Sequence, residues 1–85
     1  MKPITVYVLE GEARRYVGIT NHLQRRLAEH RTSSHSGRLI GAFAVLHTES
    51  LPDYASARRR ERFLKSGQGR AWLAVRYPKA PRAPA

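Results

Sequence analysis

The chain has 85 residues, with 16 Lys and Arg against 6 Asp and Glu, so its formal net charge is +10 at pH 7. This length allows one domain with a modest core, and the absence of cysteine excludes disulfides and thiolate metal sites. No apolar run reaches the roughly 18 residues that a membrane span needs. The basic excess is mostly arginine, which favours a polyanionic partner, most simply DNA or RNA. Charge alone leaves two alternatives, an acidic membrane surface and a basic surface with no specific partner.

The first part of the chain predicts a β-hairpin. Its strands are expected over residues 4–9 and 15–19, joined by a short turn over residues 10–13. Tyr7 lies on the first strand, and Tyr16 shares one face of the second strand with Gly18. Antiparallel pairing can bring Tyr7 and Tyr16 close together, although two ordinary tyrosines packed in a core give the same pattern.

A helix is predicted over residues 21–30, with Asn21 as its N-cap. Its buried face is marked by two leucines, Leu23 and Leu27. Arg26 and His30 are one turn apart and flank that same face. An arginine that extends its charge to solvent and a histidine at the edge of the core are the simpler interpretation.

The second half of the chain predicts one strand and two helices. The expected elements are a polar loop over residues 31–37, a buried third strand over 39–48, a helix over 53–65 closed by Gly67, and a short helix over 70–76. We therefore expect a single domain over residues 1–77. Residues 78–85 contain three prolines and no large apolar side chain, which predicts a disordered basic tail.

The helix over residues 53–65 carries an unexpected acid. Its apolar seam is expected at Tyr54, Ala57, position 61 and Leu64, and position 61 is Glu. Glu61 is also the only acid in a run of arginines. A carboxylate on this face is unfavourable unless it is paired or binds a cation. It is therefore either a salt-bridge partner for a neighbouring arginine, or a metal ligand or general acid/base.

These motifs together resemble the GIY-YIG nuclease superfamily. The resemblance covers about residues 4–75 and rests on the tripeptides that contain Tyr7 and Tyr16, then Arg26, then Glu61, in this order. The first tripeptide is Thr-Val-Tyr, so Thr5 stands where the family pattern has glycine. The segments "YVGITNHLQRRLAEH" and "ARRRERFLKSG" are most similar to small stand-alone bacterial members, which resemble the N-terminal nuclease domain of the excision-repair endonuclease subunit. The resemblance therefore also suggests a role in DNA repair.

The resemblance implies an α/β (α+β) domain with a three-stranded antiparallel sheet flanked by helices. It also implies a metal-dependent endonuclease that hydrolyses DNA phosphodiester bonds at one Mg²⁺ or Mn²⁺ ion. Tyr7, Tyr16, Arg26 and Glu61 match the catalytic positions, and His30 matches a histidine common in many members. In this interpretation Tyr7 orients or deprotonates the water, Arg26 binds the scissile phosphate, and Glu61 holds the metal. Tyr16 supports the hydrogen-bond network, and His30 relays a proton or binds phosphate.

Seven further cations are candidates for nucleic-acid contacts: Arg15, Arg25, Arg31, Arg58, Arg59, Arg62 and Lys65. The alternative function is a non-catalytic nucleic-acid-binding module on the same fold, and a protein partner that supplies substrate specificity is a further expectation. The first residues, Met-Lys-Pro-Ile, do not resemble a signal peptide, because no small-residue cleavage site follows an apolar core. We therefore expect a cytoplasmic protein.

Overall fold

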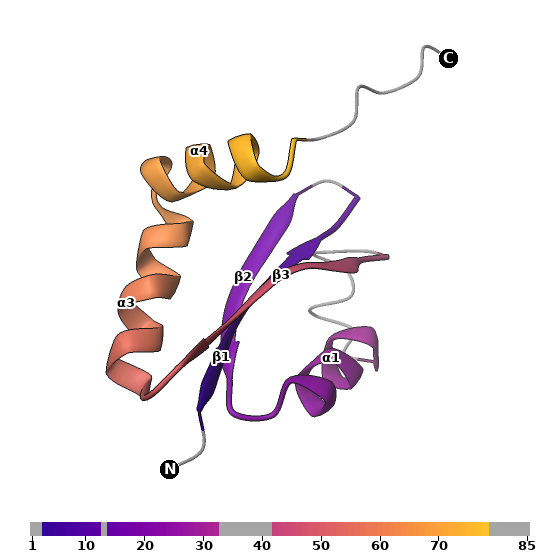
Figure 1. The fold of residues 1–85 in the computed structure, drawn as a ribbon. Coiled ribbons are helices and arrows are strands. Elements are labelled where there is room, and N and C mark those ends of the chain that lie inside the picture. Colours follow the sequence, from indigo (N-terminus) through magenta and orange to yellow (C-terminus); the bar gives the residue numbers. More distant parts are fainter. Residues whose placement is uncertain (1–2, 13, 33–41, 79–85) are drawn as a thin grey trace.

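The computed structural model describes residues 3–12, 14–32 and 42–78. Within these ranges one three-stranded antiparallel sheet is covered by helices on both faces (Figure 1). The elements are β1 (Ile4–Glu10), β2 (Arg15–Thr20), α1 (Leu23–Thr32), β3 (Ala44–Leu51), α3 (Tyr54–Lys65) and α4 (Gly67–Arg76). The predicted α+β fold is confirmed. None of the helices in these ranges is both long and apolar enough to cross a membrane.

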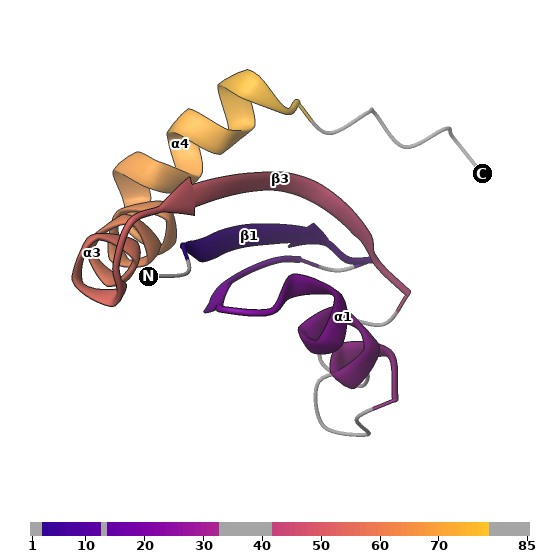
Figure 2. The same cartoon turned by 60° about the horizontal axis from the view of Figure 1, so that its bottom comes forward.

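The first strand lies in the centre of the sheet, since the strand order is β2-β1-β3. Both faces of β1 are therefore covered, and its interior residues from Val6 to Leu9 are all at most 1% exposed. Figure 2 shows α1 on one side of the sheet and α3 and α4 on the other. A central strand covered on both sides needs consecutive apolar residues, and the sequence of β1 supplies them.

The two faces of the sheet bury two separate clusters. On the side of α3 and α4, Val6 and Val8 of β1 pack with Leu64 and Leu73. On the side of α1, Tyr7 and Leu9 pack with Leu27. The alternation of side chains along β1 thus sends its tyrosine to the α1 face and its valines to the other.

The third strand differs from its prediction in position and burial. It runs from Ala44 to Leu51 rather than over residues 39–48, and residues 39–41 lie outside the described residues. Pairing with β1 extends as far as Leu51 opposite Ile4, three residues beyond the predicted end of the strand. The prediction of a buried strand is also wrong, because β3 is an edge strand and most of its residues are exposed or half-buried.

The start of α1 also differs from its prediction. The first helical hydrogen bond runs from the Arg26 amide to the His22 carbonyl, so His22 rather than Asn21 occupies the cap position. The His22 side chain accepts from the Arg25 amide through Nδ1 at 3.2 Å. Thr20 Oγ1 accepts from the His22 amide, so the preceding turn determines where the helix starts. The helix continues to Thr32, two residues beyond its predicted end.

The helices α3 and α4 meet at Ser66 rather than at a closing glycine. Asp53 caps α3 as the sequence suggests, accepting from the Ser56 amide at 2.7 Å. Ser66 ends α3 and caps α4, because its Oγ accepts from the Gly69 amide. Gly67 is therefore the first residue of α4, which begins three residues earlier than predicted. A Cβ at Gly69 would lie 1.9 Å from the Phe63 carbonyl oxygen, so the close contact between the two helices requires glycine there.

The predicted apolar seam of α3 is partly wrong. Ala57 and Leu64 are buried, but Tyr54 is 55% exposed because it lies in the first turn, at the end of the sheet.

Beyond α1 and α4, the predicted polar loop from residue 33 to 37 and the predicted tail from residue 79 lie outside the described residues.

Candidate functional site

The centre of the candidate site is the phenol of Tyr7, which is 1% exposed and lies over Gly18. These two residues are register partners on β1 and β2. A Cβ at Gly18 would lie 2.5 Å from the Tyr7 hydroxyl oxygen and 2.6 Å from Cζ. Because glycine has no side chain, the phenol can extend across β2 toward the edge of the sheet.

Tyr16 lies beside Tyr7 on the same face, as predicted. It is opposite Leu9, two pairs along the hairpin from Tyr7 and Gly18, so the two tyrosines are diagonal neighbours on one face. Their ring centroids are 6.2 Å apart, with an angle of 33° between the rings. The hairpin register alone therefore brings both motif tyrosines together.

His30 reaches the same point from α1. Its side chain is fully buried, and its Nε2 lies 2.9 Å from the Tyr7 hydroxyl. The imidazole also packs edge-on against Tyr16, at 5.0 Å between ring centroids, and against Phe43, at 6.1 Å. The simpler interpretation of an edge histidine is therefore wrong. Among the described residues, Nδ1 of His30 has no hydrogen-bond partner.

Tyr7 and His30 are both held neutral by their surroundings. Burial raises the pKa of Tyr7, although the nearby Arg26 guanidinium opposes this shift. Burial lowers the pKa of His30, and the positive charge of Arg26 lowers it further. At neutral pH the contact between them is therefore a hydrogen bond between an uncharged phenol and an uncharged imidazole.

Arg26 brings a permanent positive charge to this pair. The interaction with the Tyr7 hydroxyl is the largest cause that raises the pKa of Arg26, while burial opposes it. Its Nη1 donates to Glu29 Oε2 at 3.0 Å, and 38% of its side chain is exposed. The guanidinium thus acts on Tyr7 while remaining accessible to an anion from solvent.

Glu61 approaches from α3, on the other side of the sheet from α1. Its negative charge contributes to the raised pKa of Tyr7, although this is the smallest of the causes. Its Oε2 accepts from Lys65 Nζ at 3.1 Å, and its Oε1 lies 3.9 Å from Arg58 Nε. Glu61 therefore does form salt bridges with neighbouring cations, as one interpretation of the sequence predicts, but the closer partner is Lys65 rather than an arginine. The carboxylate is 13% exposed and both partners are more than half exposed, so solvent weakens these pairs.

A divalent cation fits Glu61 only as a hydrated ion. Within residues 3–12, 14–32 and 42–78, no group of three or more acidic, histidine or cysteine side chains could hold a metal. Mg²⁺ commonly keeps several waters and binds through one or two carboxylates together with substrate phosphates. The single Glu61 carboxylate suits that kind of binding.

The seven cations predicted to contact nucleic acid fall into two groups. Six are on the surfaces of α1 and α3 and are exposed: Arg25, Arg31, Arg58, Arg59, Arg62 and Lys65. Arg15 differs, because its side chain is 14% exposed, pairs with Glu10 and donates to the Tyr77 carbonyl oxygen. Arg15 thus joins the hairpin to the end of α4 through its Nε and Nη2 donors.

Two neighbours of the site were not identified from the sequence. Glu29 pairs with Arg26, and its position three residues later on the same helix is a spacing that could have indicated this. Phe43 packs against His30 from a segment outside any helix or strand. No local pattern distinguishes Phe43 from the other apolar residues around it.

The family model of the GIY-YIG catalytic domain matches residues 3–72. No curated protein and no solved structure matches the chain significantly.

Proposed function

Because the chain belongs to the GIY-YIG nuclease family, we propose that it is a metal-dependent endonuclease that hydrolyses phosphodiester bonds in DNA. One observation carries the proposal. The Tyr7 hydroxyl is buried over Gly18 and is hydrogen-bonded to His30. The charges of Arg26 and Glu61 both act on its pKa. Any buried phenol needs a hydrogen-bond partner, so it is the convergence of a histidine, an arginine and a carboxylate on one hydroxyl that favours a catalytic site.

In the proposed reaction, a water oxygen attacks phosphorus and one P–O ester bond breaks. One proton must leave the water, and the departing oxygen must gain one. The neutral Tyr7 phenol first orients the water as a hydrogen-bond partner. It takes the water proton only as its own proton passes to His30 Nε2, 2.9 Å away. The departing oxygen takes its proton from solvent water, and His30 later returns its proton to solvent through Tyr7. Tyr16 packs against both rings and holds this pair in place.

The charge of Arg26 couples this proton transfer to substrate binding. An imidazolium at His30 is unfavourable near the guanidinium, which already lowers the pKa of that histidine. A phosphate bound to Arg26 offsets the positive charge and makes the protonated His30 less costly. The exposed pair with Glu29 is weak, so a phosphate can compete for the guanidinium. Since His30 is fully buried, we assign it the proton relay rather than phosphate binding.

We propose that Glu61 holds one Mg²⁺ or Mn²⁺ ion. When bound, the ion supplies Lewis-acid polarisation of a phosphate oxygen. The protein's own part is the carboxylate charge, which α3 holds close enough to act on the Tyr7 hydroxyl. For the ion to bind, Lys65 and Arg58 must release the carboxylate, and their side chains can then turn toward the substrate.

The decisive experiment compares Glu61→Gln with Glu12→Gln, which removes an equal charge from an exposed turn. Each protein is incubated with labelled branched, flapped, single-stranded and duplex DNA, and with matching RNA, in Mg²⁺, Mn²⁺ or chelator. We expect divalent-dependent cleavage by the parent chain and by Glu12→Gln, and a loss on the order of 10² for Glu61→Gln. DNA binding by Glu61→Gln should hold or tighten, because an anion has left a basic surface.

The alternative is a nucleic-acid-binding module without catalysis. It predicts that the parent chain binds every substrate and cuts none. Equal cleavage by Glu61→Gln and Glu12→Gln would instead show that Glu61 is only a salt-bridge partner.

A further inference from the structure

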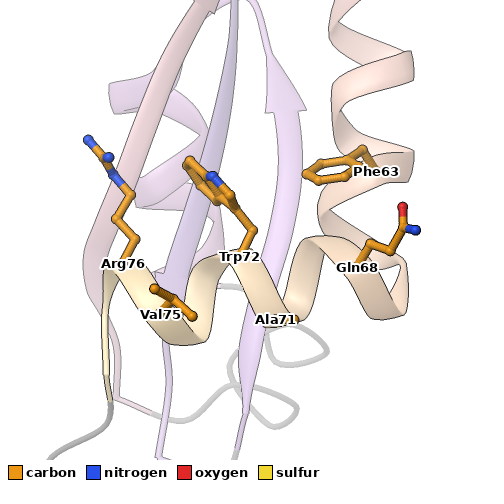
Figure 3. Close-up of a pocket in the computed structure, with 6 residues that line it drawn as sticks. All are labelled: Phe63, Gln68, Ala71, Trp72, Val75 and Arg76. Atoms are coloured by element: carbon orange, nitrogen blue, oxygen red, sulfur yellow. The ribbon is translucent and has the colours of Figure 1, made fainter.

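A shallow groove of about 640 Å³ lies on the outer side of α4, apart from the Tyr7 cluster (Figure 3). Phe63 of α3 forms one end, and the rest of the lining comes from α4: Gln68, Ala71, Trp72, Val75 and Arg76. The core beneath it belongs to the α3 and α4 side of the sheet, whereas Tyr7 and His30 lie on the α1 side. The groove is therefore a separate surface from the candidate site.

The aromatic residues of the groove are fixed in position. Trp72 and Phe63 are half-buried and pack against the apolar core, which restrains their rings. Val75, which also lines the groove, is 84% exposed. The groove thus offers rigid aromatic surface with a largely exposed apolar side chain, Val75, beside it. His47 packs edge-on against the Trp72 ring, at 5.6 Å between ring centroids.

Arginines accompany these rings. The Arg76 guanidinium carbon lies 5.4 Å from the Trp72 ring centroid, and Arg60 lies 5.0 Å from Phe63 and 4.9 Å from Trp72. Arg60 is already bound to Glu49, with its Nε at 2.9 Å from Oε1. Arg76 is exposed and forms no ion pair with any described residue. Its charge is therefore available to an anion.

The lining contains no acid, and α4 as a whole, GQGRAWLAVR, contains none either. An acidic partner is therefore favoured over a neutral apolar peptide. Rigid aromatic rings beside arginine are the usual means of binding single-stranded nucleic acid, since bases stack on the rings and phosphates pair with the cations. A duplex hides the faces of its bases and does not fit this surface.

We propose that the groove binds an unpaired strand of nucleic acid. Bases stack against Trp72 and Phe63, the Gln68 amide hydrogen-bonds base edges, and Arg76 pairs with the backbone. This inference rests on the proposed function in that nucleic acid is the substrate. It adds that substrates with an unpaired segment, such as a flap or fork, are held at a second point on the α4 side.

Trp72 is the only tryptophan in the chain, so its fluorescence reports on the groove directly. The full chain is titrated in chelator with oligothymidine, with a blunt duplex of equal length, and with buffer alone. We expect quenching by the single strand and little change with the duplex, because stacking on the indole quenches its emission. Binding without quenching would overturn the proposal.

Two variants on one helix provide the matched test. Arg76→Ala should weaken oligothymidine binding by about fivefold to tenfold, while Arg70→Ala removes the same charge outside the lining and should weaken it less. Trp72→Leu keeps an apolar side chain and should cost about tenfold or more, with thermal melting measured to confirm folding. Equal losses for Arg76→Ala and Arg70→Ala would contradict a specific site.

The inference and the proposed function can fail separately. Quenching by oligothymidine without cleavage of any substrate supports the groove and overturns the nuclease. Divalent-dependent cleavage without quenching supports the nuclease and overturns the groove. Sedimentation in the absence of nucleic acid tests the competing occupant, a second copy of the chain. A dimer that Val75→Glu dissociates would assign the groove to self-association and overturn the proposal.

Discussion

The Tyr7 hydroxyl lies over the backbone of Gly18, with no room for even a methyl group between them. The two residues face each other across β1 and β2. Gly18, in the tripeptide that begins with Tyr16, therefore leaves the space that the Tyr7 ring occupies. Tyr7 and Gly18 belong to two different tripeptide motifs of the sequence. Their contact gives a physical reason why the two motifs occur together.

Gly18→Ala should therefore displace the Tyr7 phenol. The ring is buried and cannot swing into solvent, so the added methyl strains the sheet by about 1–3 kcal/mol, or roughly 5–20 °C in Tm. Cleavage should fall with it, because the Tyr7–His30 hydrogen bond is disturbed. The control is Gly67→Ala, where a Cβ meets nothing within 4 Å. This control should melt at the parent temperature or slightly above it, because alanine favours helix. An unchanged Gly18→Ala protein would show that Tyr7 can move freely.

Stability should decline as the pH falls below about 6.5, the ordinary pKa of histidine. Burial and the charge of Arg26 lower the pKa of His30 in the folded chain, so over this range the unfolded chain binds more protons. The stability that neutral His30 provides is complete above that pH, and is lost below it at no more than about 1.4 kcal/mol per pH unit. Denaturant melts from pH 8 to pH 5 measure this dependence.

Two features isolate the contribution of His30. The pKa of Glu49 is also lowered, since hydrogen bonds from Arg60 and His47 outweigh the opposing effect of burial, but that carboxylate loses its stabilising role only below about pH 4.5. His30→Gln should flatten the pH dependence between pH 6.5 and 5. A flat profile in the parent chain would mean that His30 titrates in the folded state as it does when unfolded.

Arg26→Ala should abolish cleavage but leave Mg²⁺ binding unchanged. The proposed metal ligand, Glu61, is on α3, whereas Arg26 is on α1. Arg26→Lys keeps the charge but loses the two-pronged geometry that fits phosphate oxygens. We expect it to recover DNA binding and little of the rate. Kinetics on one flapped substrate separates the two effects, and full activity of Arg26→Lys would show that only charge is needed.

Binding to DNA should weaken steeply with salt. Arg25, Arg58 and Lys65 have side chains that are 63%, 62% and 54% exposed, in a chain of net charge +10. If about five phosphates are neutralised, log K should fall with log salt at a slope near −4 to −5. Fluorescence anisotropy in chelator from about 50 to 300 mM salt gives the slope.

Individual cations should differ in this assay. Arg62→Ala removes an exposed charge and should reduce the slope by about 1. Arg15→Ala should change the slope less and lower Tm more, because Arg15 is held by Glu10 and the Tyr77 carbonyl. The reverse ranking would return Arg15 to the nucleic-acid contacts.

Much of this protein follows from local patterns in the sequence. Alternation placed Tyr7 and Tyr16 on one face of a hairpin, and helical spacing placed His30 beside the buried leucines of α1. Both periodicities are properties of the backbone, so residues close in sequence suffice to reveal them. The acid at position 61 was visible for the same reason, because it interrupts an otherwise apolar seam.

The tertiary structure decided what local patterns cannot specify. The order β2-β1-β3 made the first strand central and left the third at the edge, since pairing between distant strands depends on the whole sheet. Packing of α1 against that sheet buried His30 completely and placed it on the Tyr7 hydroxyl, 23 residues away in sequence. Contacts over such separations form only when the chain closes on itself. The neutral Tyr7–His30 pair, the engaged state of Arg15 and the groove on α4 therefore depend on the fold.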